Sequence, residues 1–177
     1  MKNERGILLA QEKQELIQIL KQLQVVEKGT VQLKNAGSSE YYVNIKKAYG
    51  NPELMFLLCK NLREKMPREV TCFAGSGHGG IPLATRMSGL YTKNLTLVRD
   101  GAKEHGMSDL IDGYVPASKD KVAIVDDVFS TGGSLRKIIE TLAPTGAEIV
   151  GCYVIVKRGE GQLPVPLEYL LKVEDLL

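Results

Sequence analysis

The chain has 177 residues, a length that suits one domain with a sizeable core. Its hydrophobic content of 44% and charged content of 25% are ordinary for a globular protein, and a net charge of +2 is too small to indicate nucleic acid as a partner. The apolar runs are too short for a membrane span or a signal peptide. Three widely spaced cysteines in apolar runs, without metal-ligand spacing, favour a reduced, cytoplasmic protein.

The first third of the chain contains a long helical pattern and two short extended ones. Apolar residues at helical spacing predict a helix over about 11–26, and strands are expected at 31–33 and 41–45. The tripeptide Asn51-Pro52-Glu53 is typical of a helix start, because the asparagine can cap the free amides and proline suits the first turn. The buried face of that helix is expected to carry Met55, Leu58, Cys59 and Leu62.

Strands alternate with helices in the rest of the chain. Strands are expected at 70–73, 95–98, 122–125 and 149–156, helices at about 81–90 and after 134, and loops at 75–80, 99–116 and 159–166. This alternation predicts an α/β fold with a doubly wound, mostly parallel sheet and helices on both faces. Ligands of such sheets bind beyond the carboxyl ends of the strands. We expect the short C-terminal segment to pack near the N-terminal one.

The most informative stretch follows the apolar strand 122–125. Two carboxylates, Asp126 and Asp127, end the strand and precede a loop of hydroxyls and glycines at Ser130–Ser134. Free backbone N–H groups at a helix start suit a phosphate, and glycines allow close approach. Carboxylates beside a phosphate site make sense if the ligand also offers hydroxyls, as ribose 5-phosphate does. The simpler alternative is a buried strand followed by a helix cap and solvated aspartates.

The segment Val125–Ser134 resembles the phosphoribosyl-pyrophosphate motif of the type I phosphoribosyltransferases. The resemblance implies that Asp126 and Asp127 face the ribose hydroxyls. The 5-phosphate would bind to Ser130, Thr131, Gly132, Gly133 and Ser134. It also implies a Mg²⁺ ion held mainly by the substrate, bridging pyrophosphate and ribose hydroxyls.

The glycine segment Gly75–Gly80 allows two interpretations. It fits the dinucleotide-binding pattern, and Asp100 lies about where a ribose-binding acid is expected, so a nicotinamide-dependent oxidoreductase is a rival. That rival leaves the Asp126 motif unexplained and needs a larger chain. In the phosphoribosyltransferase resemblance the same segment, through His78 and Gly79, contacts pyrophosphate instead.

The polar loop after 98 resembles the mobile lid of the orotate phosphoribosyltransferases. Arg99, Lys103 and His105 match its basic positions, whereas Asp100 stands where the family usually has a second cation. The resemblance implies pyrophosphate contacts for these three residues, and catalytic roles for Lys103, Asp126 and Asp127. Glycines in this loop favour mobility. A solvated charged loop is the alternative.

A second part of the chain resembles the base-binding segment of the same family. Lys34 and the pair Tyr41-Tyr42 match it, although Asn35-Ala36 replaces a serine-glycine pair, and Arg158 matches an orotate-binding arginine. A pyrimidine carboxylate needs a cation and flat packing partners, which these residues supply together with Ser130. Strand packing alone would also explain the tyrosines.

The resemblance implies one domain over 1–177, with a helix and base-binding hood at about 1–48 and a core at about 49–177. It implies transfer of phosphoribose from 5-phosphoribosyl 1-pyrophosphate to orotate, giving orotidine 5-monophosphate and pyrophosphate. The expected partners are these substrates and a second copy of the chain, with the lid shared across a homodimer, and neither nucleic acid nor membrane. A phosphoribosyltransferase for another base and a non-enzymatic phosphoribosyl-pyrophosphate sensor remain alternatives.

Overall fold

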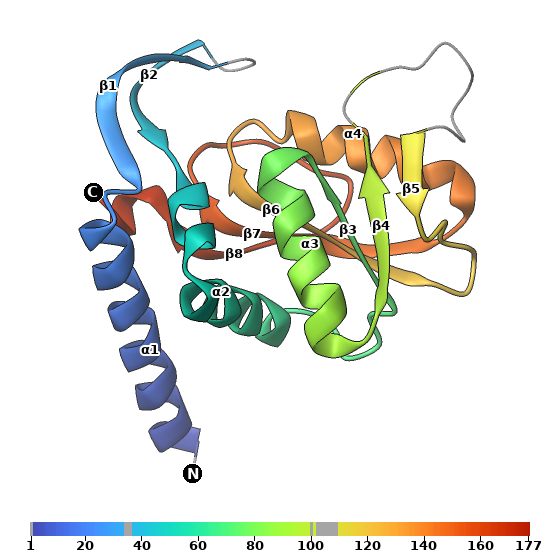
Figure 1. Ribbon diagram of the computed structural model, residues 1–177, viewed down its shortest axis with the longest axis horizontal. Helices are drawn as coiled ribbons and strands as arrows, with labels where there is room; N and C mark the ends of the chain where they lie inside the picture. Colours follow the sequence, from blue (N-terminus) through green and yellow to red (C-terminus); the bar gives the residue numbers. More distant parts are fainter. Residues whose placement is uncertain (1, 34–36, 100, 102–109) are drawn as a thin grey trace.

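A six-stranded sheet forms the centre of the computed structural model, which describes residues 2–33, 37–99, 101 and 110–177 (Figure 1). In spatial order the strands are β5 (Ile111–Gly113), β4 (Asn94–Val98), β3 (Cys72–Ser76), β6 (Lys121–Phe129), β7 (Glu148–Lys157) and β8 (Leu167–Lys172). All neighbours pair in parallel except β4 and β5. The predicted fold class is confirmed, but β5 forms inside the expected 99–116 loop and β8 was not predicted.

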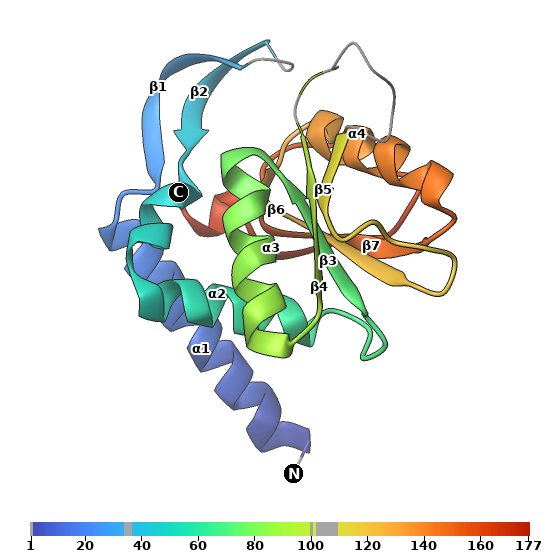
Figure 2. The ribbon, with the colours of Figure 1, turned by 45° about the vertical axis from the view of Figure 1, so that its right-hand side comes forward.

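Helices cover both faces of this sheet (Figure 2). One face carries α2 (Pro52–Glu64) and α3 (Gly77–Tyr91), and the other carries α4 (Gly133–Leu142). Side chains alternate along β6, so Ala123 and Val125 join the apolar cluster of α2 and α3, whereas Val122 and Ile124 join that of α4. Burial on both faces explains why this strand is continuously apolar.

The start of α2 follows the predicted capping pattern. The Asn51 side chain accepts hydrogen bonds from the amides of Glu53 and Leu54, at 2.9 and 3.1 Å, and Pro52 occupies the first helical position. The four apolar residues predicted for its inner face are all buried. The capping signal is local, which is why the sequence locates this boundary well.

The N-terminal part differs from its prediction. Helix α1 spans Lys2–Gln22, and β1 (Val26–Leu33) and β2 (Gly37–Val43) form a separate antiparallel sheet that stands at one end of the large sheet (Figure 1). Gln24 has a φ of +49°, which ends the helical direction before residue 26. Ile45 belongs to a 3₁₀ helix, η1 (Ile45–Gly50), and not to the second strand. We call the β1–β2 sheet the hood.

The C-terminal segment returns to α1, as predicted. After the short 3₁₀ helix η3 (Ala143–Thr145), β7 and β8, the chain ends in η4 (Val173–Asp175), and Asp175 pairs with Lys13 at 3.5 Å. Leu16 and Leu20 of α1 lie in the same apolar cluster as Leu176. The N-terminal helix is thereby fixed to the end of the chain.

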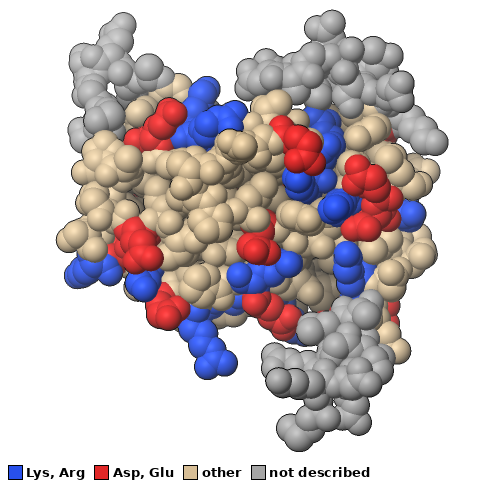
Figure 3. All heavy atoms as spheres, turned by 180° about the vertical axis from the view of Figure 1, so that it is seen from behind, with Lys and Arg blue, Asp and Glu red and all other residues tan. Residues whose placement is uncertain are grey.

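The surface and interior agree with the composition. The three cysteines are buried as free thiols, and burial raises the pKa of Cys59 and Cys152 to about 12. Seen from behind, basic and acidic side chains lie beside one another over the described part of the surface (Figure 3). Within the described ranges, no helix combines the length and apolar character needed to cross a bilayer.

Candidate active site

The aspartate pair lies inside β6, not after its end as the sequence suggested. Pairing of β6 with β3 stops at Ile124, but pairing with β7 continues to Phe129, so Asp126 and Asp127 lie where one neighbour has left the strand. From β3 the sheet continues toward β4, and from β6 it continues toward β7. The gap between β3 and β6 is thus the reversal point of the strand order, where ligands of doubly wound sheets bind.

The first turn of α3 closes this gap from one side. Helix α3 begins at Gly77, so the expected glycine loop is largely helical. A Cβ built on Gly79 would overlap the carboxylates of Asp127 and Asp126, and one on Gly80 would lie 2.6 Å from the Val125 carbonyl. Only glycine therefore allows this approach. His78, in the same turn, is exposed.

The two carboxylates differ in environment. Asp126 is buried, and its Oδ1 accepts the Asp127 amide at 2.9 Å. Burial, and then the charge of Asp127, raise the pKa of Asp126 well above its ordinary value. Asp127 accepts the Val128 amide at 2.8 Å and pairs with the Lys46 ammonium at 3.0 Å. Lys46, which lies in η1 and 81 positions away, was not predicted as a site residue.

Two aromatic residues complete this side of the site. The Tyr49 hydroxyl donates to the Gly79 carbonyl at 2.9 Å, and burial raises its pKa above the usual value. Lys46 also donates to the Tyr42 hydroxyl at 3.5 Å, and its ammonium lies 5.8 Å from the centre of that ring. Tyr42, a predicted base-site residue, is therefore joined to the predicted ribose site through Lys46.

The loop 130–134 leads directly into α4. Gly132 caps the helix with a φ of +81° and has no side chain to bond the first-turn amides. These amides point out of the helix N-terminus, as in many phosphate sites. The Arg136 guanidinium donates to the Thr131 carbonyl of this loop at 2.6 Å and to the Gln162 carbonyl at 2.9 Å, and so ties the loop to the segment around Gln162. Its role was not predicted from the sequence.

Arg158 connects this loop with the hood. Its guanidinium donates to Ser130 Oγ at 2.9 Å and to the Tyr41 carbonyl at 3.5 Å. The next residue, Gly159, lies so close to the Ser130 carbonyl that a Cβ there would overlap it. The structure thus brings Arg158 together with Ser130 and the Tyr41 backbone, although these three residues are far apart in the chain.

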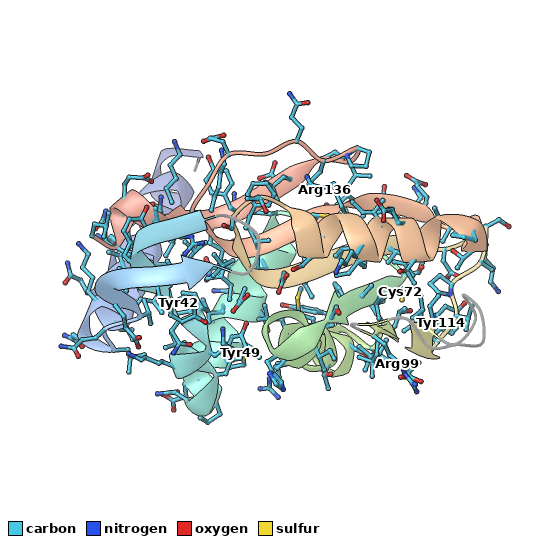
Figure 4. All side chains as sticks on the ribbon, turned by 90° about the horizontal axis from the view of Figure 1, so that it is seen from above. Tyr42, Tyr49, Cys72, Arg99, Tyr114 and Arg136 are labelled. Carbon is cyan, nitrogen blue, oxygen red and sulfur yellow. The ribbon has the colours of Figure 1, made fainter. Side chains whose placement is uncertain are left out.

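Arg99 lies at the other end of the same edge. Seen from above, Tyr42 and Tyr49 are near the hood, whereas Arg99 and Tyr114 are near β4 and β5 (Figure 4). The Arg99 guanidinium forms a two-pronged salt bridge with Asp112 of β5, with one bond of 2.6 Å. The other residues predicted for the lid, Asp100, Lys103 and His105, and the predicted base-site residue Lys34 lie outside the described residues.

The donor set indicates how a magnesium ion could bind. In the described ranges, His, Cys, Asp and Glu side chains form no cluster of three or more that could hold a metal. Asp126 and Asp127 form a carboxylate pair at the gap, and one of them is already bonded to Lys46. Mg²⁺ keeps much of its coordination to water and substrate phosphates. The residues therefore fit an ion held by the substrate and not by a protein cage.

Comparisons with known proteins agree with this geometry. Residues 54–170 match the model of the phosphoribosyl transferase domain family. The chain is 36% identical to the orotate phosphoribosyltransferase of Methanothermobacter thermautotrophicus over 92% of this chain and 93% of that one. It is also 36% identical to the enzyme of that name from Pyrococcus furiosus, over 84% and 83%. This chain belongs to the orotate phosphoribosyltransferase family.

Solved structures of the family share the fold. The crystal structure of orotate phosphoribosyltransferase from Aeropyrum pernix superposes with a TM-score of 0.80 at 27% identity, covering 92% of this chain and 96% of that one. Leishmania donovani UMP synthase gives 0.78 at 25% identity, over 92% of this chain and 37% of that longer one. Membership of this family leaves the oxidoreductase alternative without support. The glycines of α3 are explained by their close approach to the aspartates and need no dinucleotide.

Proposed function

We propose that this enzyme transfers the phosphoribosyl group from 5-phosphoribosyl 1-pyrophosphate to orotate, releasing pyrophosphate and forming orotidine 5-monophosphate. The observation that carries the proposal is the joining of three expected subsites. Asp126 and Asp127 lie at the gap beside α3, and the loop 130–134 directly follows the same strand. Arg158, expected to bind the base, donates a hydrogen bond to Ser130 of that loop. A ribose with a 5-phosphate and a base at C1 spans these three places.

The ribose and 5-phosphate would be held from one continuous segment. The carboxylates of Asp126 and Asp127 accept hydrogen bonds from the ribose hydroxyls, and the 5-phosphate sits on Ser130–Ser134 at the positive end of α4. Gly132 and Gly133 let the backbone approach the anion. This contact is remote from the bond that breaks, so its binding energy holds C1 in place for the reaction.

The leaving group would meet positive charge. As the bond from C1 to the pyrophosphate oxygen breaks, negative charge gathers on pyrophosphate and positive charge on the ribose ring. Arg99, Lys103 and His105 would stabilise the pyrophosphate, and His78 and Gly79 of α3 would contact it as well. A substrate-held Mg²⁺ would supply further positive charge to the leaving group.

Orotate would bind between the hood and the loop. Arg158 and Lys34 offer cations for the base carboxylate, Tyr41 and Tyr42 offer flat packing surfaces, and the Arg158 guanidinium is already oriented by Ser130. We assign residues of about 1–48 to the N-terminal helix together with the hood, and residues of about 49–177 to the core. With its free, buried cysteines, we expect the enzyme to act in the cytoplasm.

The lid would serve the site of a second subunit. Arg99, at the base of the lid, lies at the opposite end of the edge from Tyr42, which is compatible with a homodimer whose lids cross the interface. Subunit complementation tests this. Lys103→Ala and Asp127→Ala homodimers should each be nearly inactive, whereas mixing them should restore activity in one site of each hybrid. Confirmed subunit exchange without restored activity would contradict a shared lid.

Pyrophosphate release measured with a panel of bases tests the reaction itself. We expect turnover with orotate and little with uracil, adenine or hypoxanthine. Arg158→Ala should raise the KM for orotate about tenfold or more, since a charge-assisted hydrogen bond contributes roughly 1.5–3 kcal/mol, while binding of phosphoribosyl pyrophosphate changes little. Preferred use of another base would show that the chain is a phosphoribosyltransferase for that base. Binding of phosphoribosyl pyrophosphate without any turnover would favour a non-enzymatic sensor.

A further inference from the structure

Lys46 makes a contact that none of the expected roles explains. It belongs to η1, the short helix that joins the hood to the core, and its ammonium lies 3.0 Å from Asp127 Oδ2. The lysine side chain is 35% exposed and that of Asp127 is 13% exposed, so the pair is partly shielded from water. A shielded ion pair between two such residues is stronger than a surface one.

The aspartates need such a partner. Asp126 is buried directly beside Asp127, and two adjacent carboxylates repel each other when both are ionised. Among the ion pairs that the described residues form, only the one made by Lys46 involves either aspartate. Tyr49 and Cys152 also lie near the pair, and burial raises the pKa of both, so both are neutral. The Gly79 backbone of α3 packs against the two carboxylates.

We propose that Lys46 is a positioning residue of the ribose subsite, whose ammonium balances the charge of Asp126 and Asp127 so that both carboxylates can accept ribose hydroxyls. This role rests on the proposed function and adds a residue to it. Lys46 acts through the aspartates and holds Asp127 turned toward the hood. Because the same ammonium contacts Tyr42, it also ties the position of the hood aromatic to the charge of the ribose subsite.

The electrostatics of both partners agree with this role. Burial alone would lower the pKa of Lys46, but the charge of Asp127 and the hydrogen bond to it outweigh burial and raise that pKa. Burial and Asp127 raise the pKa of Asp126, and the charge of Lys46 opposes them. Removing the ammonium therefore favours protonation of Asp126, and a protonated carboxyl loses acceptor capacity.

Three variants separate this role from a merely structural one. Lys46→Met removes the charge and keeps the chain length, and Lys46→Arg keeps a cation. The matched control is Lys47→Met, because the neighbouring lysine pairs with Glu27 at 2.7 Å and bonds the Gln24 carbonyl, away from the aspartates. Calorimetric affinity for phosphoribosyl pyrophosphate is measured with Mg²⁺ from acidic to alkaline pH, in two buffers that differ in ionisation heat.

The expected result is a loss that depends on pH. For Lys46→Met the acid limb of the affinity profile moves up by about one pKa unit, so binding falls about tenfold on that limb and recovers at alkaline pH. Lys46→Arg and Lys47→Met should follow the unmodified enzyme. A loss of equal size at every pH, tighter binding, or no change for Lys46→Met would overturn the proposal.

A second measurement keeps the test independent of the reaction. Carboxyl ¹³C NMR of the ligand-free protein follows the titration of Asp126 and Asp127 directly, assigned with single Asp→Asn variants. In Lys46→Met the pair should titrate at higher pH than in the Lys47→Met control. An unchanged titration overturns the role of Lys46. If the unmodified chain fails to bind phosphoribosyl pyrophosphate, the proposed function is wrong, and the NMR titration still decides whether Lys46 balances the pair.

Discussion

The guanidinium of Arg136 donates a 2.6 Å hydrogen bond to the main-chain carbonyl of Thr131, in the middle of the loop expected to hold the 5-phosphate. The other arm of the same guanidinium reaches the carbonyl of Gln162 at 2.9 Å. Arg136 therefore joins the phosphate loop to the segment that follows Arg158. A planar, two-armed donor suits this task, and a lysine ammonium does not reproduce its geometry.

Replacing Arg136 should loosen the phosphate loop. For Arg136→Lys we expect the KM for phosphoribosyl pyrophosphate to rise about tenfold, in line with loss of one charge-assisted hydrogen bond, with a smaller change in the KM for orotate. Steady-state kinetics with each substrate varied in turn measures this. Lys137→Ala, at an exposed position on the same helix, is the control and should leave both KM values unchanged. Equal KM increases for both substrates would contradict a specific role at the loop.

The salt bridge between Arg99 and Asp112 leads to a second prediction. The Asp112 carboxylate holds the guanidinium of Arg99, for which we propose a contact with pyrophosphate. Asp112→Asn should therefore lower the KM for phosphoribosyl pyrophosphate about two- to threefold at low salt, and the gain should shrink at high salt. Thermal stability should fall by about 1 kcal/mol at most, since both side chains are about 40% exposed. A higher KM would mean that Asp112 instead orients Arg99 for its substrate.

Two glycines of α3 form a matched pair for a third prediction. Gly79 packs against both aspartates, whereas a Cβ on Gly89 would meet nothing within 4 Å. Gly79→Ala should push the carboxylates out of place, abolish binding of phosphoribosyl pyrophosphate and lower the melting temperature. Gly89→Ala should keep activity and stabilise the helix by roughly 0.5–1 kcal/mol. Full activity of Gly79→Ala would show that α3 can withdraw from the gap without cost to the site.

The raised pKa of Asp126 predicts how stability depends on pH. A folded-state pKa above the unfolded value means that the folded protein binds this proton more tightly, so stability falls as pH rises from the unfolded pKa to the folded one. Asp126→Asn removes that loss. We expect the variant to be more stable at neutral pH, by roughly 1–3 kcal/mol, and nearly equal at acidic pH, while losing activity. Melting curves across this pH range test the sign, and a difference that does not vary with pH would contradict it.

The sequence predicted those features that depend on neighbouring residues. Asn51 and Pro52 mark the start of α2 by local hydrogen bonding, and the apolar run 122–125 marks the central strand by its composition. The helix start after Ser134 was likewise expected from the glycines and hydroxyls of the loop before it. Such features can be predicted from the sequence because the residues that form them are neighbours in the chain.

Features that depend on distant partners could not be predicted in this way. Strand β5 has three residues and owes its form to pairing with β4, and β6 continues through the aspartates because β7 does. Lys46 meets Asp127 across 81 positions, and nothing near Lys46 in the chain distinguishes it from Lys47. Arg136 occupies an ordinary helical position, and only the fold brings Gln162 within its reach. Tertiary packing determines all four.

The position of β6 between β3 and β7 determines how mutations far from the site would inactivate the enzyme. The aspartates are fixed by the central strand, whose two faces belong to the two apolar clusters of the domain. Local melting of a peripheral segment should therefore leave the two aspartates in place. Amides of β6 should thus exchange hydrogen only through global unfolding. Mutations that weaken either cluster from a distance should reduce the number of working molecules in a cell and leave the affinity of each survivor unchanged.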